Sequence, residues 1–327
     1  MNVKQLQNLH NTPLWHVIRP LTIFDGRSVL PPLFVSLILT YRCNLNCEFC
    51  YQDKTKRETF GDLTLEDVKS IEKNIQKSFF PKPRIHLFGG EPTVNSDFLE
   101  IVKFFDENGY STYITTNGIG IGKYAETLMS LDGLKEINLS LNAVDSNKTL
   151  DTLKLLNSFR THGHPLINLN CPINHTNQDS LFRIAEEAQG SHANCITFQH
   201  TTFTERYDVG LDSKLIKEHI KRIKESKFET PVFFLPDIKV YDIDAYYTDK
   251  NFPYGKTGCI FPWFILFIQP NGDVIPCDEM DIPMGNALMD RLGKVWNGQK
   301  YREFRKNIIK SGVSHLICQR CCHRRYY

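Results

Sequence analysis

The chain has 327 residues, enough for one large domain and a smaller one, and its 41% hydrophobic content is that of an ordinary globular protein. A formal charge of +2 gives no basic surface of the kind that binds nucleic acid or anionic membranes. The first residues lack the apolar core of a signal peptide, and the longest apolar runs are too short to span a bilayer. With ten cysteines and no export signal, we expect a cytoplasmic protein whose thiols bind metal.

Strand-like and helix-like segments alternate from residue 33 onward. The apolar run 33–40 predicts a strand buried on both faces, and the periodicity of 63–79 predicts a helix with Thr64 as its N-cap. Further strands are expected at 84–88, 111–116, 136–141, 166–173 and 195–199, and further helices at 96–107, 123–130, 147–160 and 178–189. Six strands separated by five helices predict an α/β fold with parallel pairing and right-handed crossovers, short of the eight units of a full barrel.

A cysteine triplet follows the first expected strand. Cys43, Cys47 and Cys50 have the spacing C-x3-C-x2-C. Three thiolates can hold three corners of a cubane iron–sulfur cluster and leave one iron open, whereas an electron-transfer cluster takes four thiolates. A zinc site would also need a fourth ligand, and its cysteines usually come as spaced pairs. An open iron can chelate the amine and carboxylate of S-adenosylmethionine (SAM), so the triplet indicates a catalytic cluster.

The triplet resembles that of the radical SAM superfamily, and the strand count fits the partial (β/α)6 barrel that this resemblance implies. Gly89-Gly90-Glu91-Pro92 after the second expected strand matches the superfamily's GGEP motif. Glycines let a backbone approach a ligand closely, so carbonyls there and the Glu91 carboxylate are expected to accept from the SAM ammonium. Taken alone, the same four residues would be a strand-to-helix turn.

Other strand ends carry further resemblances to SAM-binding elements. Phe49 occupies the position where the family usually places an aromatic side chain against adenine. Thr116-Asn117 belongs to a turn that resembles the family's TNG element. Ser140 and Asn142 resemble a Ser-x-Asp element near the ribose and carboxylate of SAM, with an amide in place of the acid. A hydrogen-bonding role for Asn142 therefore remains open, while a charged role is excluded. Alone, each of these is turn chemistry.

A second cysteine group lies near the end of the chain. Cys259 and Cys277, with Gly272 between them, fit the opening of a SPASM-type auxiliary domain, with a hairpin at 263–269 and 273–275 and a helix beyond it. Only five cysteines remain in this region, so the shortened "twitch" form with one cluster is the closer match. The expected ligands are Cys259, Cys277, Cys318 and Cys321, and Cys322 could replace Cys321 or stay unligated. A structural zinc site is the alternative.

The resemblance also divides the chain. We expect an N-terminal extension at 1–32, the partial barrel at 33–205, a connector at 206–258 and the auxiliary domain at 259–327. The connector contains a predicted helix at 215–227 with one apolar face, followed by a cluster of aromatic residues. Cys171 and Cys195 fall on expected strands. They are either inert buried thiols or hydrogen-atom donors that face the barrel.

These features together imply an oxidoreductase-type enzyme with two 4Fe-4S clusters, one catalytic and one auxiliary. It would cleave SAM to a 5′-deoxyadenosyl radical and take a hydrogen atom from an unactivated carbon of a small natural-product precursor or a short peptide. A flavodoxin or ferredoxin would supply the electron, and no nucleic acid or membrane partner is expected. Two-electron oxidation is the preferred outcome. The alternatives are a peptide epimerase with a cysteine hydrogen donor and a non-catalytic iron–sulfur or zinc scaffold.

Overall fold

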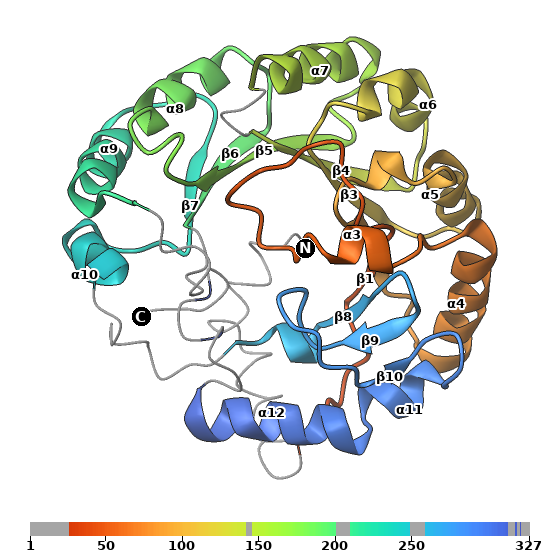
Figure 1. Cartoon of the computed structure of the whole chain (residues 1–327). Coiled ribbons are helices and arrows are strands. Elements are labelled where there is room, and N and C mark those ends of the chain that lie inside the picture. Colours follow the sequence, from red (N-terminus) through yellow and green to blue (C-terminus); the bar gives the residue numbers. More distant parts are fainter. Residues whose placement is uncertain are drawn as a thin grey trace.

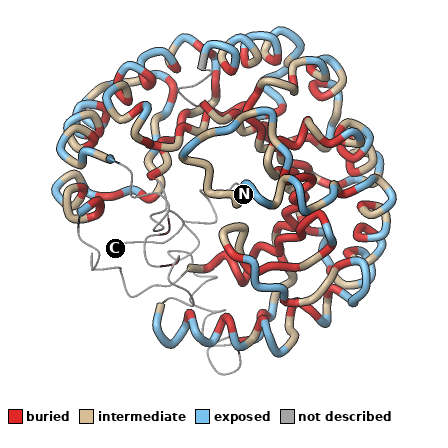
Figure 2. The backbone as a smooth tube through the Cα atoms, in the orientation of Figure 1, coloured by how far each residue is buried: buried red, intermediate tan, exposed pale blue. Residues whose placement is uncertain are grey.

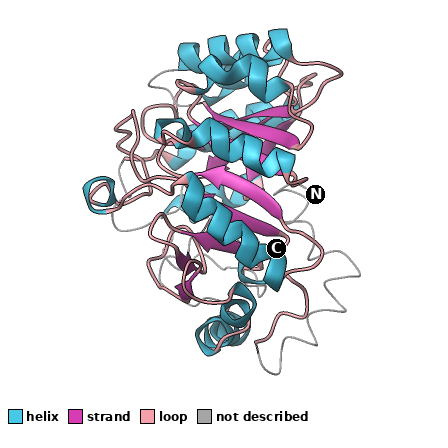
Figure 3. Cartoon of the chain, turned by 90° about the vertical axis from the view of Figure 1, so that its right-hand side faces the viewer, coloured by secondary structure: helices cyan, strands magenta, loops and turns pink. Residues whose placement is uncertain are grey.

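A computed structural model describes residues 26–141, 146–200, 210–248 and 259–312, together with Cys318 and Cys321. Its strands form a single ten-stranded sheet in the order β10-β9-β8-β1-β2-β3-β4-β5-β6-β7. Figure 1 shows the helices as an outer ring around these strands, and the side view in Figure 3 shows the strands enclosed between helices. This is the α/β partial barrel that the sequence predicts.

The parallel part of the sheet extends from β8 through β1 to β7. Its strands are β8 (Ile265–Ile268), β1 (Phe34–Ile38), β2 (Arg84–Phe88), β3 (Thr112–Thr116), β4 (Leu134–Ser140), β5 (Leu166–Ile173), β6 (Cys195–His200) and β7 (Val232–Leu235). The antiparallel strands β9 (Asp273–Ile275) and β10 (Gly285–Asn286) complete it. The predicted hairpin is therefore present, and its first strand continues the barrel sheet beside β1.

The helices pack around the sheet with their apolar sides inward, as the red inner faces and pale blue outer faces in Figure 2 show. They are α3 (Lys56–Thr59), α4 (Leu65–Ser78), α5 (Phe98–Glu107), α6 (Ala125–Met129), α7 (Ser146–Phe159), α8 (Leu181–Gln189), α9 (Ser213–Glu225), α10 (Ile243–Thr248), α11 (Leu292–Trp296) and α12 (Gln299–Ser311). Helix α4 begins at the predicted cap, because Thr64 and Asp67 each accept a hydrogen bond from the other's backbone N–H. None of the helices in the described ranges is long and apolar enough to cross a membrane.

The alternation of side chains along each strand determines which residues line the barrel interior. On β5, Leu169 and Cys171 are fully buried, whereas Asn168 and Asn170 line the central cavity. Successive side chains of a strand point to opposite faces, so the apolar set packs against the helices and the polar set faces inward. The barrel interior is therefore lined partly by amides rather than filled by aliphatic side chains.

Strands β7 and β10 were not predicted. Strand β7 pairs in parallel with β6, inside the segment that the sequence indicates as a connector. Its four residues lie between Pro231 and Pro236 and include two phenylalanines of the aromatic cluster noted in the sequence. So short a run between prolines carries no strand periodicity, and pairing with β6 supplies the strand conformation. The parallel sheet thus continues beyond the six expected strands, with β8 beside β1 and β7 beside β6.

Arg305 on α12 links the auxiliary segment to the start of the described chain, because its Nη1 donates to the Gly26 carbonyl at 3.4 Å. Its guanidinium is fully buried and donates to the carbonyls of Pro262 and Trp296, each at 2.8 Å. The same group lies over the rings of Trp296 and Tyr301, at 4.4 and 4.7 Å from their centroids. Burial lowers the pKa of Arg305 to about 10, so the side chain stays charged at neutral pH.

We expect Arg305→Met to lower the free energy of unfolding by about 3 kcal/mol, because two buried carbonyls lose their donor and the cation–π contacts disappear. Thermal unfolding followed by circular dichroism measures the change. Arg183→Met is the matched control, since Arg183 is largely exposed and pairs only with Glu187 on the same helix. Equal melting temperatures for the Arg305 variant and the native chain would contradict the prediction.

Candidate active site

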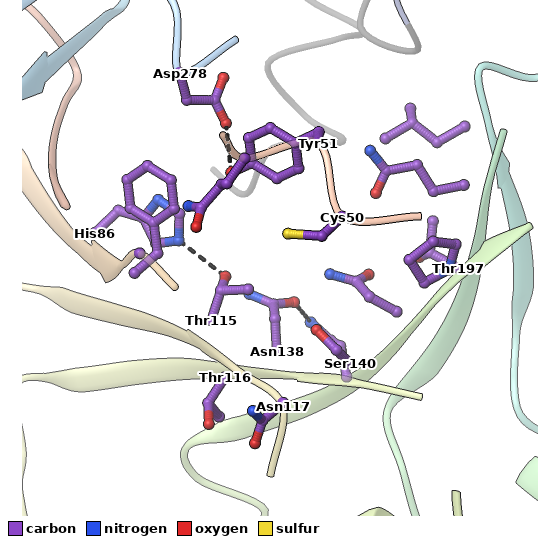
Figure 4. A pocket seen from close by; sticks show the side chains of 18 of the residues that line it. Cys50, Tyr51, His86, Thr115, Thr116, Asn117, Asn138, Ser140, Thr197 and Asp278 are labelled. Atoms are coloured by element: carbon purple, nitrogen blue, oxygen red, sulfur yellow. Dashed lines mark hydrogen bonds between the residues drawn. The ribbon is translucent and has the colours of Figure 1, made fainter. Parts of the chain in front are cut away.

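A cavity of about 670 Å³ occupies the barrel. It reaches from the loop after β1, which carries the cysteine triplet, to Leu166 and Cys195 at the amino ends of β5 and β6. Figure 4 shows Cys50 above Asn138 and Ser140, with its sulfur pointing toward the middle of the view. The carboxyl ends of parallel strands are where ligands bind in such folds.

The cysteine triplet lies at one end of the cavity. Cys43, Cys47 and Cys50 all line it, and each is partly exposed. Burial raises the pKa of Cys43 and of Cys47, and for Cys47 the charges of Cys50 and Cys43 raise it further. Three thiols within electrostatic reach of one another would resist ionising together, and bound iron would remove that cost.

The arrangement of the triplet is compatible with a cubane cluster. Within the described ranges, no three His, Cys, Asp or Glu side chains converge as they would around one metal ion. A cubane cluster binds each thiolate to a different iron, so its three cysteines need to face the same space without meeting at a point. All three cysteines line one end of the cavity, which is compatible with that requirement.

Gly89 and Gly90, directly after β2, allow the loop after β2 to pack against the backbone that leads to Cys43. A Cβ on Gly89, where φ is +153°, would lie 2.3 Å from the Thr40 carbonyl oxygen, and a Cβ on Gly90 would lie 2.3 Å from that of Arg42. The Gly90 N–H donates to the Thr40 carbonyl at 2.8 Å, and the Glu91 N–H donates to that of Arg42 at 2.9 Å. Both glycines also line the cavity. Glycine is therefore needed at both positions, because the backbone after β2 packs directly against the backbone that leads into the cysteine loop.

The Glu91 carboxylate forms hydrogen bonds with other residues of the protein. It is 0% exposed. Its Oε1 accepts from the Thr93 and Thr116 hydroxyls at 2.6 and 2.7 Å, and its Oε2 accepts from the Asn117 N–H at 2.7 Å. The predicted contact of Glu91 with the SAM ammonium therefore stays a prediction. In this structure the carboxylate joins the loop after β2 to the turn after β3.

The remaining predicted SAM contacts lie around the same space. Phe49, Thr116, Asn117 and Ser140 all line the cavity, as Figure 4 shows for the last three. Asn142 lies outside the described residues. The structure thus brings these four side chains and the cysteine triplet to one cavity, and their individual contacts with SAM stay predictions.

The sequence patterns did not single out His86, which lies on β2 and lines the cavity. Its Nδ1 lies 3.3 Å from the Ser36 hydroxyl, its Nε2 lies 2.9 Å from the Thr115 hydroxyl, and its ring stacks on Phe88. Burial lowers the pKa of His86 to about 4, so the imidazole is neutral at physiological pH. Polar residues at alternate positions of an otherwise apolar strand are the signal that could have found it.

A chain of hydrogen bonds continues along the same wall. The Cys195 thiol donates to Asn168 at 3.2 Å, Asn168 donates to Asn138 at 3.4 Å, and Asn138 donates to Glu136 at 3.0 Å. The first three residues are neighbours in register across β6, β5 and β4. Of the two cysteines on strands, Cys195 therefore lines the cavity, whereas Cys171 is buried on the outer face, where Asn177 donates to its sulfur at 3.6 Å.

The second cysteine group flanks the hairpin. Because β8 and β9 are antiparallel, Cys259 before β8 and Cys277 after β9 come to the same end of the hairpin. Burial raises the pKa of Cys277 well above its ordinary value, and the charges of Asp278, Glu279 and Cys259 add to this. Cys318 and Cys321 are also buried, and Cys322 lies outside the described residues.

The two cysteine groups are linked through the residues next to them. The Tyr51 hydroxyl, directly after Cys50, donates to the Asp278 carboxylate, directly after Cys277, at 3.3 Å. Asp278 also lines the cavity, and Figure 4 shows it approaching from the auxiliary segment. The cavity is therefore enclosed by both parts of the chain.

Family comparisons agree with this geometry. The model of the radical SAM superfamily matches residues 37–165, and that of the SPASM iron–sulfur cluster-binding domain matches residues 259–322. The chain is a radical SAM protein with a SPASM domain. The two matches contain the cysteine triplet and the second cysteine group, respectively.

Among curated relatives, a probable GTP 3′,8-cyclase of Saccharolobus solfataricus is 28% identical over 240 residues, which are 66% of this radical SAM protein and 75% of the cyclase. A probable GTP 3′,8-cyclase of Saccharolobus islandicus is 30% identical over 58% of this chain and 62% of its own.

Solved structures show the same fold at low identity. Streptococcus suis SuiB bound to its precursor peptide SuiA gives a TM-score of 0.65 at 16% identity, over 85% of this chain and 67% of SuiB. The enzyme anSMEcpe with bound AdoMet and the Cp18Cys peptide gives a TM-score of 0.63 at 16% identity, over 88% of each chain. At this identity the likeness establishes the fold.

Proposed function

We propose that this radical SAM protein removes a hydrogen atom from an unactivated carbon of a short peptide or a small natural-product precursor. The observation that carries the proposal is the placement of Cys43, Cys47 and Cys50 on one wall of a cavity that the GGEP glycines also line. These cysteines would hold a 4Fe-4S cluster. When bound, the cluster supplies the electron that cleaves SAM to methionine and a 5′-deoxyadenosyl radical, after reduction by a flavodoxin or ferredoxin.

The chain's own residues would bind and orient SAM. The backbone carbonyls of Gly89 and Gly90 are the proposed acceptors for its ammonium, and Ser140 and Asn142 are assigned to the ribose and carboxylate. Phe49 would pack against adenine. Phe49, Phe88 and Phe267 give the cavity apolar walls that limit the access of water to a radical.

An auxiliary 4Fe-4S cluster would be held by Cys259, Cys277, Cys318 and Cys321, with Cys322 as the alternative to Cys321. We propose a two-electron oxidation, for which an auxiliary cluster held by these cysteines would supply the acceptor of the one electron that the substrate radical has to give up. Asp278 lines the cavity, and the Cys277 thiol donates to its carboxylate at 3.6 Å. We assign Asp278 as the acceptor of the proton that the oxidation releases. A zinc ion bound by the same thiols is the structural alternative, and elemental analysis separates the two.

A peptide fits the cavity better than a nucleoside triphosphate does. Among the described residues that line the cavity there is no Lys or Arg to balance a triphosphate, while Glu136, Asp278 and Glu279 are acidic. Amides such as Asn168 and Asn170 can pair with peptide N–H and C=O groups. The solved relatives SuiB and anSMEcpe bind peptides, which supports this choice over the GTP of the cyclase relatives.

The test is anaerobic incubation of the reconstituted protein with SAM and dithionite. The proposal expects 5′-deoxyadenosine and methionine in equal amounts, measured by liquid chromatography. A non-catalytic iron–sulfur or zinc scaffold would give no 5′-deoxyadenosine, and that result would overturn the proposal. A peptide epimerase would cleave SAM equally well, so this experiment leaves the choice between oxidation and epimerisation to isotope labelling.

A further inference from the structure

The turn after β3 contacts a cysteine of the triplet directly. The Asn117 side-chain amide nitrogen lies 3.8 Å from the Cys43 sulfur and 2.7 Å from the Asn44 side-chain oxygen. The Leu45 backbone N–H donates to the same sulfur at 3.4 Å. Sulfur is a large, weak acceptor, so N–H···S contacts are longer than N–H···O bonds. The Cys43 sulfur therefore faces two N–H donors.

The orientation of the Asn117 amide is fixed by its other contacts. Its oxygen accepts from the Ile119 backbone N–H at 3.0 Å. An amide rotated by half a turn would set its NH2 group against that N–H and its oxygen against the oxygen of Asn44. The NH2 group must therefore point toward Asn44 and Cys43.

Glu91 holds this turn in place. Its carboxylate accepts from the Asn117 backbone N–H and from the Thr116 hydroxyl, both at 2.7 Å, and it is completely buried. A buried charge with several N–H and O–H donors is tightly constrained, because losing any donor exposes the full desolvation cost. The acid of the GGEP motif thus fixes the position of Asn117 from behind the cavity wall.

We infer that Asn117 is a positioning and tuning residue for the cluster proposed at Cys43, Cys47 and Cys50, and that Glu91 holds Asn117 in that role. This inference rests on the proposed function, since it needs a cluster ligated by Cys43. An N–H···S bond withdraws electron density from a ligating thiolate and stabilises the reduced, more negative form of a cluster. The Asn117 amide therefore raises the reduction potential and makes the reduction that precedes SAM cleavage easier.

The experiment is a redox titration of the reconstituted full-length protein, followed by electron paramagnetic resonance. The signal of the proposed catalytic cluster is the one that changes when SAM is added. Asn117→Ala is expected to shift its midpoint to a lower potential, and Glu91→Gln to shift it in the same direction by a smaller amount. Thr197→Val is the control, because Thr197 lines the same cavity and has no described contact with the triplet.

A second measurement distinguishes an effect on the reduction potential of the cluster from a general loss of activity. With reduced flavodoxin, a weaker reductant than dithionite, the rate of SAM cleavage should fall more in Asn117→Ala than it falls with dithionite. An unshifted midpoint in both Asn117→Ala and Glu91→Gln would overturn the inference, and so would an equal shift in Thr197→Val. If Asn117→Ala does not fold, the Glu91→Gln midpoint decides. A wild-type protein without any SAM-sensitive signal would instead overturn the proposed cluster, and the inference with it.

Discussion

Replacing Cys43, Cys47 and Cys50 together with alanine is expected to abolish the formation of 5′-deoxyadenosine from SAM. It should also lower the iron content from about eight to about four atoms per chain, because only the auxiliary 4Fe-4S cluster would remain. The physical reason is that all three thiols line one end of the cavity, and the described part of the chain offers no other cysteine group there. Iron analysis and SAM cleavage on the same anaerobic preparation measure both effects.

Cys171→Ala is the matched control for this triple variant. Its thiol is fully buried on the outer face of β5 and lies in neither cysteine group, so iron content and cleavage should stay at the native level. An undiminished rate of SAM cleavage in the triple variant would remove the cluster assignment. Zinc in place of the remaining iron would favour the structural alternative for the second cysteine group.

The product formed in deuterated water is expected to carry no deuterium at the reacting carbon. A thiol S–H bond is weak enough to quench a carbon radical, so a cysteine near the substrate radical would deliver solvent deuterium and make the reaction an epimerisation. Cys171 faces away from the cavity. Cys195 lines the cavity, but it is the first residue of β6 and so lies at the amino end of its strand, whereas the cysteine triplet follows the carboxyl end of β1. The Cys195 thiol also donates to Asn168. Oxidation is therefore the expected course.

Mass spectrometry of the product decides between the two courses. A product heavier by one deuterium, with the gain lost in Cys195→Ala and retained in Cys171→Ala, would establish epimerisation with Cys195 as the donor. The same gain lost only in Cys322→Ala would place the donor in the auxiliary segment. Either result would replace the oxidation proposed here.

Local sequence patterns were sufficient to predict most of the strands and helices of the barrel. Strands β2 and β5 have the predicted limits, and α4 starts at the capping residue that the sequence indicates, because periodicity and capping are encoded within a few residues. Strand β7 was missed because four residues between prolines carry too little pattern. Its identity depends on pairing with β6, which is a tertiary property.

The cysteines of the candidate site could be predicted from the sequence, but the contacts that support them could not. The spacing of the triplet predicts that Cys43, Cys47 and Cys50 act together, and the structure places all three on one cavity, while their role as ligands stays a prediction. The sequence could not show that Glu91 bonds to Asn117, or that Gly89 packs on Thr40, because each pair joins segments brought together only by the sheet. His86 was missed for a related reason. A lone histidine becomes informative only when strand register shows which face of the sheet it occupies.

The pairing of β8 with β1 limits how this protein can move. Phe34 to Leu37 of β1 lie in parallel register with Ile265 to Ile268 of β8, so the strand that precedes the cysteine triplet and the first strand of the SPASM hairpin share one hydrogen-bond ladder. A hinge motion between the two parts would have to break that ladder. The segments that carry Cys43 and Cys277 are therefore joined through backbone hydrogen bonds of one sheet. Two clusters bound at these segments would be held at a fixed separation, so the distance for electron transfer between them would not depend on a hinge.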